Sequence, residues 1–462
     1  MKTFKIDSLL QKNGWLSPAF VTVDDSGTIV AVASSAKQYD QELPFLAIPG
    51  LPNAHSHAFQ AAMVGLAEHL PPLQQTDDFW TWRHFMYKLA LQLSPEDVHS
   101  IARYLYARML CFGFTSVAEF HYLHLDPQGK PYSNPLEMTE ALCDAAHSVG
   151  MQMTLIQVYY NQSTFGKPPT VEQRRFIFPN VGAYEAFVHK SESYVRKAFP
   201  EFKIGTSVHS LRAAIQEDVV KILASPIIEG PLHLHIAEQM REVDDCLAGW
   251  GKKPLTWLLD NVPIGPNHNL VHSTHVTKEE VARLARSGAQ AVLCPTTEAN
   301  LGDGVFPLVE YLALGGQIAV GTDSHVGINA FEELKWLDYV QRLMTRKRNV
   351  LCKTAGDDSG ALLFDKAWAG GNAALGTPSN DYFEKGKPFT CLLIDPNHPY
   401  LVERPRERLL SSMIYGGDPT LMVGTIVKGR RLCENLHHCE ESAIRHEFEK
   451  TMTRLRDRSL YS

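Results

Sequence analysis

Two histidines at spacing two, His55 and His57, follow an apolar run that ends in Pro-Gly-Leu-Pro. In an extended strand, residues i and i+2 point to the same side, so both imidazoles would face one point. Two neutral imidazoles at a rigid strand end are suitable ligands for a divalent metal such as zinc. The pair is equally compatible with two ordinary polar residues at a strand end, so a metal site requires further ligands downstream.

Three later apolar runs also end in residues that can bind a metal or transfer a proton. One run carries His233 and His235, with Glu238 three residues after the second histidine. The other two runs lead into His272 and Asp323. A single histidine of this kind is usually structural. Four strand ends that all carry His or Asp indicate one shared site, provided that the fold brings these ends together.

The elements that must position these residues are eight apolar runs, which alternate with amphipathic, helix-like segments. Most runs are nearly continuous in apolar residues, as expected of parallel strands that are buried on both faces. Eight strand-then-helix units predict an α/β fold, a TIM-like (β/α)8 barrel whose active site lies at the C-terminal strand ends. The runs are 47–57, 114–120, 153–159, 203–210, 231–237, 269–274, 289–295 and 317–323.

The segments outside these strands divide into helices, long inserts and two chain ends. Inserts at about 58–92 and 160–182 are candidate substrate-binding loops. Both chain ends read as short strands, which cannot be stable as isolated hairpins. We therefore expect three parts. A small composite β-sandwich is built from both ends, at 1–46 and 380–440, a metal-dependent catalytic barrel spans 47–379, and a C-terminal helix spans 441–462.

The composition is that of an ordinary globular protein. The chain has 462 residues, 44% hydrophobic and 21% charged. A formal charge of −7 argues against a general nucleic-acid binder. No apolar run is long enough for a membrane span, and the N-terminus lacks a signal-peptide pattern. Eight dispersed cysteines suit reduced thiols, so we expect a cytoplasmic protein. The Cys433–Cys439 segment superficially resembles a metal site but lies far from the other ligands.

Motifs around the candidate residues resemble the amidohydrolase superfamily. His-x-His after the first strand, His on the fifth and sixth and Asp on the eighth is the arrangement of that superfamily. The resemblance covers about 45–350, whereas 380–440 departs from the usual pattern and Ala61 replaces an expected basic residue. The matching motifs are Pro-Asn-Ala-His-Ser-His-Ala-Phe-Gln (52–60), Phe-Trp-Thr-Trp-Arg (79–83), Thr-Ser-Val-Ala-Glu-Phe-His-Tyr-Leu-His (115–124), His-Ser-Leu-Arg (209–212), His-Leu-His-Ile-Ala-Glu-Gln (233–239), Cys-Pro-Thr-Thr-Glu-Ala-Asn-Leu-Gly-Asp-Gly (294–304) and Gly-Thr-Asp-Ser-His-Val (321–326).

The resemblance implies one zinc ion per chain, and its ligands would be His55, His57, His235 and Asp323. Iron or manganese would also suit such a ligand set. The fourth run ends Thr-Ser-Val-His-Ser without a lysine that could bridge a second metal, which favours one ion.

Three residues would then carry the proton transfers. Asp323, beside both metal and water, is the expected proton acceptor. Glu238 would pass a proton to the substrate nitrogen, and the alternative is that it only orients His235. His272 would orient the attacking water and stabilise the tetrahedral intermediate.

The resemblance also implies a small dicarboxylate substrate, N-formimidoyl-L-glutamate, hydrolysed to N-formyl-L-glutamate and ammonia in histidine degradation. Arginine suits bidentate capture of carboxylates, and Arg83 and Arg212 are the candidates, although a lone arginine is more often a surface residue. By resemblance, Gln60, Tyr122 and His209 would hold the amino-acid end.

Two other functions are compatible with parts of this pattern. A deaminase of a heterocycle such as guanine or a pterin would share the metal ligands but would not need two arginines. A non-catalytic scaffold of the same fold would lose ligands, whereas every expected ligand is present here. The superfamily resemblance also implies a homodimer, whereas the negative charge and the lack of a long apolar run predict no nucleic-acid or membrane partner.

Overall fold

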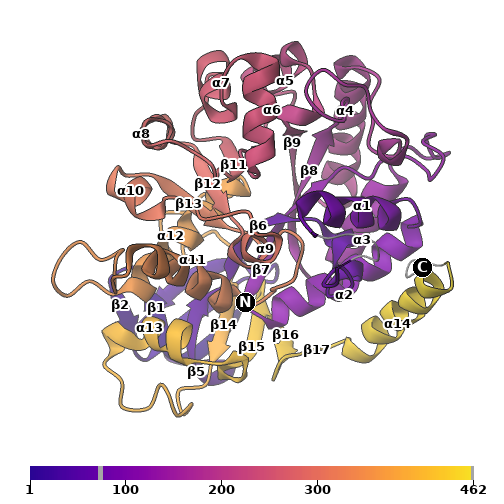
Figure 1. The fold of residues 1–462 in the computed structure, drawn as a ribbon. Coiled ribbons are helices and arrows are strands. Elements are labelled where there is room, and N and C mark those ends of the chain that lie inside the picture. Colours follow the sequence, from indigo (N-terminus) through magenta and orange to yellow (C-terminus); the bar gives the residue numbers. More distant parts are fainter. Residues whose placement is uncertain (71–75, 459–462) are drawn as a thin grey trace.

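The computed structural model describes residues 1–70 and 76–458, and its centre is a sheet of eight parallel strands (Figure 1). Each strand pairs with the next along the chain, and a bridge between Ser56 and Asp323 joins the last strand to the first. Each of the eight strands coincides with one of the runs predicted from the sequence and extends at most one residue beyond it, which confirms the TIM-like barrel. They are β6 (Leu51–Ser56), β7 (Phe114–His121), β8 (Gln152–Tyr159), β9 (Lys203–Ser210), β10 (Leu232–Ile236), β11 (His268–His272), β12 (Gln290–Leu293) and β13 (Gln317–Val320).

Helices follow the strands and surround them. Their ends carry the expected signals: Ser94 caps α2 in a capping box with Asp97, and Gly150 and Gly288 end α3 and α8 in the left-handed conformation. The barrel helices are α2 (Pro95–Cys111), α3 (Glu137–Val149), α4 (Val181–Ala198), α5 (Gln216–Ala224), α6 (Met240–Trp250), α7 (Pro254–Asn261), α8 (Lys278–Ser287), α9 (Pro295–Leu301), α10 (Leu308–Ala313), α11 (Ala330–Thr345) and α12 (Ser359–Ala374).

The two long inserts lie near the C-terminal strand ends. The first contains a 3-10 helix, η1 (Ala58–Met63), and helix α1 (Phe79–Ala90), and the second contains η2 (Val171–Gln173). Residues 71–75 of the first predicted insert lie outside the described residues. Asp78 caps α1 by accepting from the amides of Trp80 and Thr81, which fixes where this helix begins over the barrel.

Both chain ends join in one continuous mixed sheet beside the barrel, seen in indigo and orange to yellow in Figure 1. Its order is β17-β16-β15-β14-β5-β1-β3-β4, with β2 paired to β1. A separate core of residues such as Phe4, Val21 and Phe389 packs there. The strands are β1 (Lys2–Gln11), β2 (Gly14–Leu16), β3 (Ala19–Val23), β4 (Ile29–Ala33), β5 (Gln41–Pro49), β14 (Cys391–Ile394), β15 (Met422–Val427), β16 (Arg430–Glu434) and β17 (His437–His438).

The run predicted as one strand at 47–57 is two strands that serve different sheets. Strand β5 ends at Pro49 and pairs with β14, and β6 begins at Leu51 in the barrel. Gly50 separates them, and a Cβ there would lie 2.2 Å from Thr115 Cγ2. The close approach requires glycine, since any side chain would overlap the threonine. The domain boundaries proposed from the sequence remain a prediction.

Short helices and one long helix complete the C-terminal part. The short ones are η4 (Arg406–Arg408), α13 (Leu409–Ser411), the π-helix η5 (Ser412–Gly416) and η6 (Pro419–Leu421), whereas a further short helix, η3 (Leu211–Ala213), follows β9 in the barrel. Helix α14 (Glu441–Asp457) packs on α2, where Arg454 and Arg458 each lie 2.7 Å from the buried carboxylate of Asp97. The last four residues of the helix predicted at 441–462 lie outside the described residues. Among the described residues, no helix is both long and apolar enough to cross a membrane.

Candidate active site

Four buried side chains converge at the C-terminal ends of the barrel strands: His55, His57, His235 and Asp323. The Nε2 atom of His55 lies 3.1 Å from that of His57 and 2.9 Å from that of His235. The Nε2 atom of His57 lies 3.2 Å from Asp323 Oδ1. Ligands of a tetrahedral metal with bonds of about 2.0–2.1 Å lie at similar separations, about 3.3 Å apart. This donor set therefore fits one metal ion.

The backbone fixes which nitrogen of two of these rings can bind a metal. His57 donates from Nδ1 to the Phe120 carbonyl at 3.0 Å, and His235 donates from Nδ1 to the His209 carbonyl at 2.9 Å. The Nε2 lone pairs are then free to face the shared point. Burial lowers the pKa of His57 to about 3, so the ring is neutral, as a ligand must be.

Close backbone packing positions the aspartate. A Cβ on Gly321 would lie 2.7 Å from His55 Cβ, so only glycine lets the chain after β13 approach β6 this closely. Asp323 has a φ of 47° and donates its amide to the His55 carbonyl at 3.0 Å. A non-glycine residue at positive φ stores strain, and such strain is common at functional sites.

His272 lies among three carboxylates. Its Nδ1 is 3.3 Å from Glu298 Oε1, and its Nε2 is 3.7 Å from both Glu238 Oε1 and Asp323 Oδ2. Burial alone would lower the pKa of His272, but the neighbouring carboxylates, with Glu238 the largest contributor, raise that pKa to about 10. Burial raises the pKa of Asp323 to about 7. Both shifts favour the protonated form of the side chain, and shifted pKa values of this kind are common at functional sites.

A buried arginine lies between two glutamates on the opposite side of the pocket. Arg212 Nη2 is 3.1 Å from Glu238 Oε2, and Arg212 Nε is 3.7 Å from Glu242 Oε2. The guanidinium is fully buried, and within the described residues its Nε and Nη1 atoms have no hydrogen-bond partner. Buried donors without partners are unfavourable unless a ligand accepts from them.

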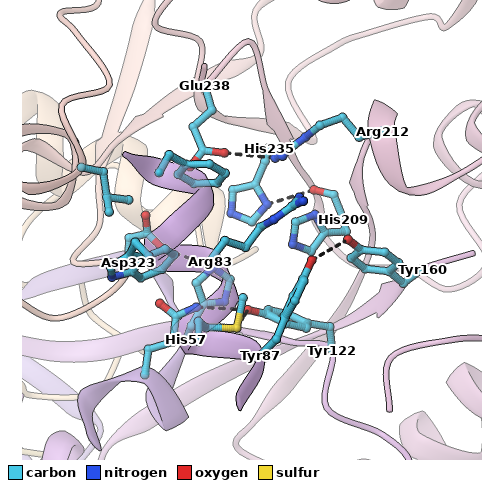
Figure 2. A pocket seen from close by; sticks show the side chains of 15 residues that line it. His57, Arg83, Tyr87, Tyr122, Tyr160, His209, Arg212, His235, Glu238 and Asp323 are labelled. Atoms are coloured by element: carbon cyan, nitrogen blue, oxygen red, sulfur yellow. Dashed lines mark hydrogen bonds and ion pairs between the residues drawn. The ribbon is translucent and has the colours of Figure 1, made fainter. Parts of the chain in front are cut away.

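These groups line one pocket together with aromatic side chains from the two inserts (Figure 2). Arg83 of α1 lies over the rings of Trp80 and Tyr87, at 4.4 Å and 5.4 Å. Gln60 donates to the Tyr122 hydroxyl at 3.0 Å. The lining residues are His57, Gln60, Phe79, Trp82, Arg83, Met86, Tyr87, Tyr122, Tyr160, His209, Arg212, His235, Glu238, Leu301 and Asp323.

The structure brings together every site residue named from the sequence. His55 and His272 do not line the pocket but contact its lining residues directly. By contrast, the Cys433–Cys439 segment is not among the groups that could hold a metal in the part of the chain described. Its His438 donates to the Val149 carbonyl, and the Cys433 sulfur lies 2.8 Å from the Cys111 sulfur.

Five residues near the site were not predicted: Tyr87, Tyr160, Gln173, Glu242 and Glu298. The buried amide of Gln173 donates to both tyrosine hydroxyls, at 3.1 Å and 2.9 Å. Glu298 lies within the motif 294–304 that resembles the superfamily, and this resemblance could have marked it as a site residue. No local pattern indicated its contact with His272.

The comparisons with known proteins agree with this architecture. The sequence profile of the Amidohydrolase family matches residues 46–432. A formimidoylglutamate deiminase of Pseudomonas aeruginosa is 39% identical over 99% of this chain and 100% of its own length. The crystal structure of an amidohydrolase from Brucella melitensis superposes with a TM-score of 0.91 and 36% identity, and the match covers 98% of this chain and 100% of that one. An adenosine deaminase from Xanthomonas campestris with bound zinc shares the fold, with a TM-score of 0.79 and 20% identity over 98% of each chain.

A parallel barrel whose strand ends gather three histidines and an aspartate defines a metal-dependent hydrolase, and the chain belongs to the amidohydrolase family. It is an enzyme that hydrolyses a C–N bond, and it is similar over its whole length to a formimidoylglutamate deiminase.

Proposed function

We propose that the enzyme hydrolyses N-formimidoyl-L-glutamate to N-formyl-L-glutamate and ammonia, a reaction of histidine degradation. The observation that carries the proposal is one pocket that joins a metal-ligand set to two arginines, Arg83 and Arg212. A dicarboxylate needs two cations, whereas a neutral heterocycle needs none. The likeness to the Pseudomonas aeruginosa deiminase supports the same substrate.

The metal ligands in this proposal are His55, His57, His235 and Asp323, and the metal is zinc, one per chain. When bound, a divalent ion lowers the pKa of its water to around 7 and supplies a nucleophile. Iron and manganese also suit three imidazoles and a carboxylate. Strand β9 ends Thr-Ser-Val-His-Ser without a lysine that could bridge a second ion, which favours one ion over two.

The proton transfers are assigned to groups that face one another. Asp323 accepts the proton lost by water, and Glu238 delivers a proton to the imino nitrogen that leaves as ammonia. His272, with Nδ1 directed to Glu298, keeps its Nε2 proton toward the space between Glu238 and Asp323. That proton can donate to oxygen as negative charge develops there.

Recognition of the amino-acid end is assigned to the two arginines and three polar neighbours. Arg212 offers one carboxylate its buried Nη1, which has no hydrogen-bond partner among the described residues, and Arg83, stacked on Trp80, meets the other. Gln60, Tyr122 and His209 complete this end of the pocket. Homodimer formation and a cytoplasmic location remain predictions from the sequence.

An ammonia-release assay on a preparation of known metal content tests the proposal. Formimidoylglutamate, formimidoylaspartate and guanine are compared at equal concentrations. We expect turnover of formimidoylglutamate, weaker or no turnover of the shorter analogue and none of guanine. Preferred turnover of guanine would replace this function by heterocycle deamination.

A further inference from the structure

A second groove, separate from the active-site pocket, opens between the loop after β7, the second insert and helix α4. Its volume is about 780 Å³, within the range of about 300–1,000 Å³ that is usual for sites of small molecules. Figure 1 shows α4 on the outside of the barrel. We call this feature the α4 groove, and its lining includes Pro169, Thr170, Arg174, Phe178, Phe187 and Lys190.

The buried part of the α4 groove is aromatic. The ring centroid of His124 lies 4.9 Å from that of Phe178 and 5.0 Å from that of Phe187, and the two phenylalanine rings are 5.3 Å apart. Four of the lining residues are prolines, whose fixed φ makes the walls stiff. A stiff aromatic groove loses little entropy when a flat ring binds in it.

The charge of the α4 groove is positive. Arg174 and Lys190 are cationic, and no lining residue is acidic. Burial lowers the pKa of His124 to about 4, although its hydrogen bond to the Val158 carbonyl acts in the opposite direction. This ring is therefore neutral near pH 7, and the two cations set the charge of the groove.

Neither cation forms an ion pair within the described part of the chain. Arg174 donates from Nε and Nη1 to backbone carbonyls, which carry no net charge. On α4, Glu192 lies two residues from Lys190 but pairs with Arg196 instead, at 2.7 Å. Two cations without a carboxylate, beside an aromatic surface, favour a ligand that combines an aromatic ring with a carboxylate.

One side chain connects the α4 groove to the active-site pocket. Thr170, which lines the groove, donates its amide to Gln173 Oε1 at 2.9 Å. The Nε2 atom of the same glutamine donates to the hydroxyls of Tyr87 and Tyr160, at 3.1 Å and 2.9 Å. Both tyrosines line the active-site pocket. A ligand that fixes the backbone around η2 would therefore also fix the two tyrosines.

We propose that the α4 groove is an effector site for a small aromatic carboxylate, and that its occupation is transmitted to the active-site pocket through Thr170, Gln173 and the two tyrosines. The ring of the ligand packs in the aromatic part of the groove, and Arg174 and Lys190 hold its carboxylate. By linkage, ligands of the two pockets then change each other's affinity.

Two probes of equal shape test the chemistry of the ligand. 2-Naphthoate and 2-naphthamide share one ring system and differ in charge, and isothermal titration calorimetry gives both dissociation constants. We expect the carboxylate to bind roughly tenfold or more tightly than the amide. Lys190→Glu should weaken 2-naphthoate roughly three- to tenfold. Lys197→Glu, an exposed position on the same helix, is the matched control and should bind normally.

Two further variants test where the probe binds. Ala186 lines the α4 groove and is exposed, so Ala186→Trp fills the groove and should abolish binding, and circular dichroism checks the fold. Arg83→Met alters the active-site pocket and should leave the affinity for 2-naphthoate unchanged. Loss of binding in Arg83→Met would place the probe in the active-site pocket, and equal affinity for both probes would exclude recognition of charge. A dimer that dissociates in Ala186→Trp would assign the groove to a second copy of the chain. Each of these three results would overturn the proposal.

Hydrogen–deuterium exchange of α1 tests the connection between the two pockets. This helix carries Tyr87 and does not line the α4 groove. Saturating 2-naphthoate should slow the exchange of its amides about twofold or more in the native protein, because Gln173 holds Tyr87 more firmly. In Gln173→Leu the probe should still bind, and exchange in α1 should stay unchanged. No slowing in the native protein, or equal slowing in Gln173→Leu, would overturn the transmission. None of these measurements uses a substrate, so their outcome is independent of the proposed function.

Discussion

Glu238 contacts cations of two kinds, the guanidinium of Arg212 and the imidazole of His272, at 3.1 Å and 3.7 Å. The metal ligands lie beside it, and one of them, His235, stands three residues before it on β10. Loss of a ligand should therefore lower the metal content, whereas loss of the proton donor should lower kcat and leave the metal in place. Substitution of single side chains can therefore separate metal binding from proton transfer.

The His55→Ala variant should lose metal and activity together, because it removes the ring that lies beside all three other ligands. The Glu238→Gln variant should keep its metal, and its kcat should fall roughly 10²–10⁴-fold, the usual contribution of a general acid or base. Elemental analysis and steady-state kinetics on the same samples measure both effects. Retention of most of the rate by Glu238→Gln would remove this residue from the proton transfer.

Replacing Arg83 by Met should lower kcat/KM by roughly tenfold to a few hundredfold, since a hydrogen bond to a charged group contributes about 1.5–3 kcal/mol. Binding energy from the carboxylate end also positions the reacting carbon, so kcat should fall as KM rises. Substrate with esterified carboxylates is the control, and on it the variant and the native enzyme should be nearly equal. A normal kcat/KM for the free dicarboxylate would exclude Arg83 from binding.

The effect of Arg212→Met on activity is harder to interpret, because this substitution should also lower the stability of the protein. Arg212 lies between Glu238 and Glu242 in a fully buried position, so its loss leaves two carboxylates without their cation. Breaking a buried ion pair commonly destabilises a protein by about 3–5 kcal/mol. The thermal midpoint must therefore be measured beside the kinetics.

The metal ligands could be predicted from the sequence because each stands at a strand end at a spacing that fixes its direction. Glu242, Glu298 and Gln173 could not, because their partners come from other segments. Gln173 contacts Tyr87 of the first insert and Tyr160 after β8. No local periodicity indicates contacts between two irregular inserts.

At the scale of elements, the eight barrel strands followed from their apolar runs and the interruptions between them. In the chain-end sheet, strand β5 was predicted only in part, because its last residues were assigned to the first barrel strand. Strand β5 continues into β6 as one apolar run, and the division at Gly50 depends on a contact with Thr115, which is remote in sequence. Its pairing with β14 is equally remote.

The insert that contains η2 shapes the pocket through Gln173. The substitution Gln173→Leu should therefore lower kcat/KM for the substrate more than it lowers metal binding. Loss of two hydrogen bonds should release the Tyr87 and Tyr160 hydroxyls, and we expect kcat/KM to fall about tenfold, with metal content unchanged. Gln128→Leu, an exposed position, is the matched control. A lower thermal midpoint with unchanged kinetics would limit Gln173 to a structural role.

At the scale of the whole molecule, buried neutral histidines link folding stability to pH. Burial lowers the pKa of His233 to about 4, although its hydrogen bond to the Ala374 carbonyl acts in the opposite direction. The unfolded chain, with a histidine pKa of about 6.5, then binds a proton that the folded chain does not. The stability from this residue is fully present above about pH 6.5 and is lost as the pH falls toward 4.

The free energy of unfolding of the metal-free protein should therefore decrease by up to about 1.4 kcal/mol per pH unit for this histidine between pH 6.5 and 4. Urea denaturation at several pH values measures the slope. His233→Gln should reduce this slope by up to the contribution of one proton, about 1.4 kcal/mol per pH unit. His437→Gln, at an exposed position, should leave the slope unchanged. Equal slopes in both variants would assign the pH dependence to other groups.

The joining of the two chain ends in one sheet has a consequence for synthesis on the ribosome. Strand β5 ends at Pro49, and its partner β14 begins only at Cys391. At about 5–20 residues per second, the edge of β5 stays without that partner for roughly tens of seconds while the barrel is made. During that time an apolar strand edge is open to pairing with other chains. A ribosome that stalls within the barrel would thus release a fragment prone to aggregation, which makes the emerging N-terminal strands a natural client for chaperones.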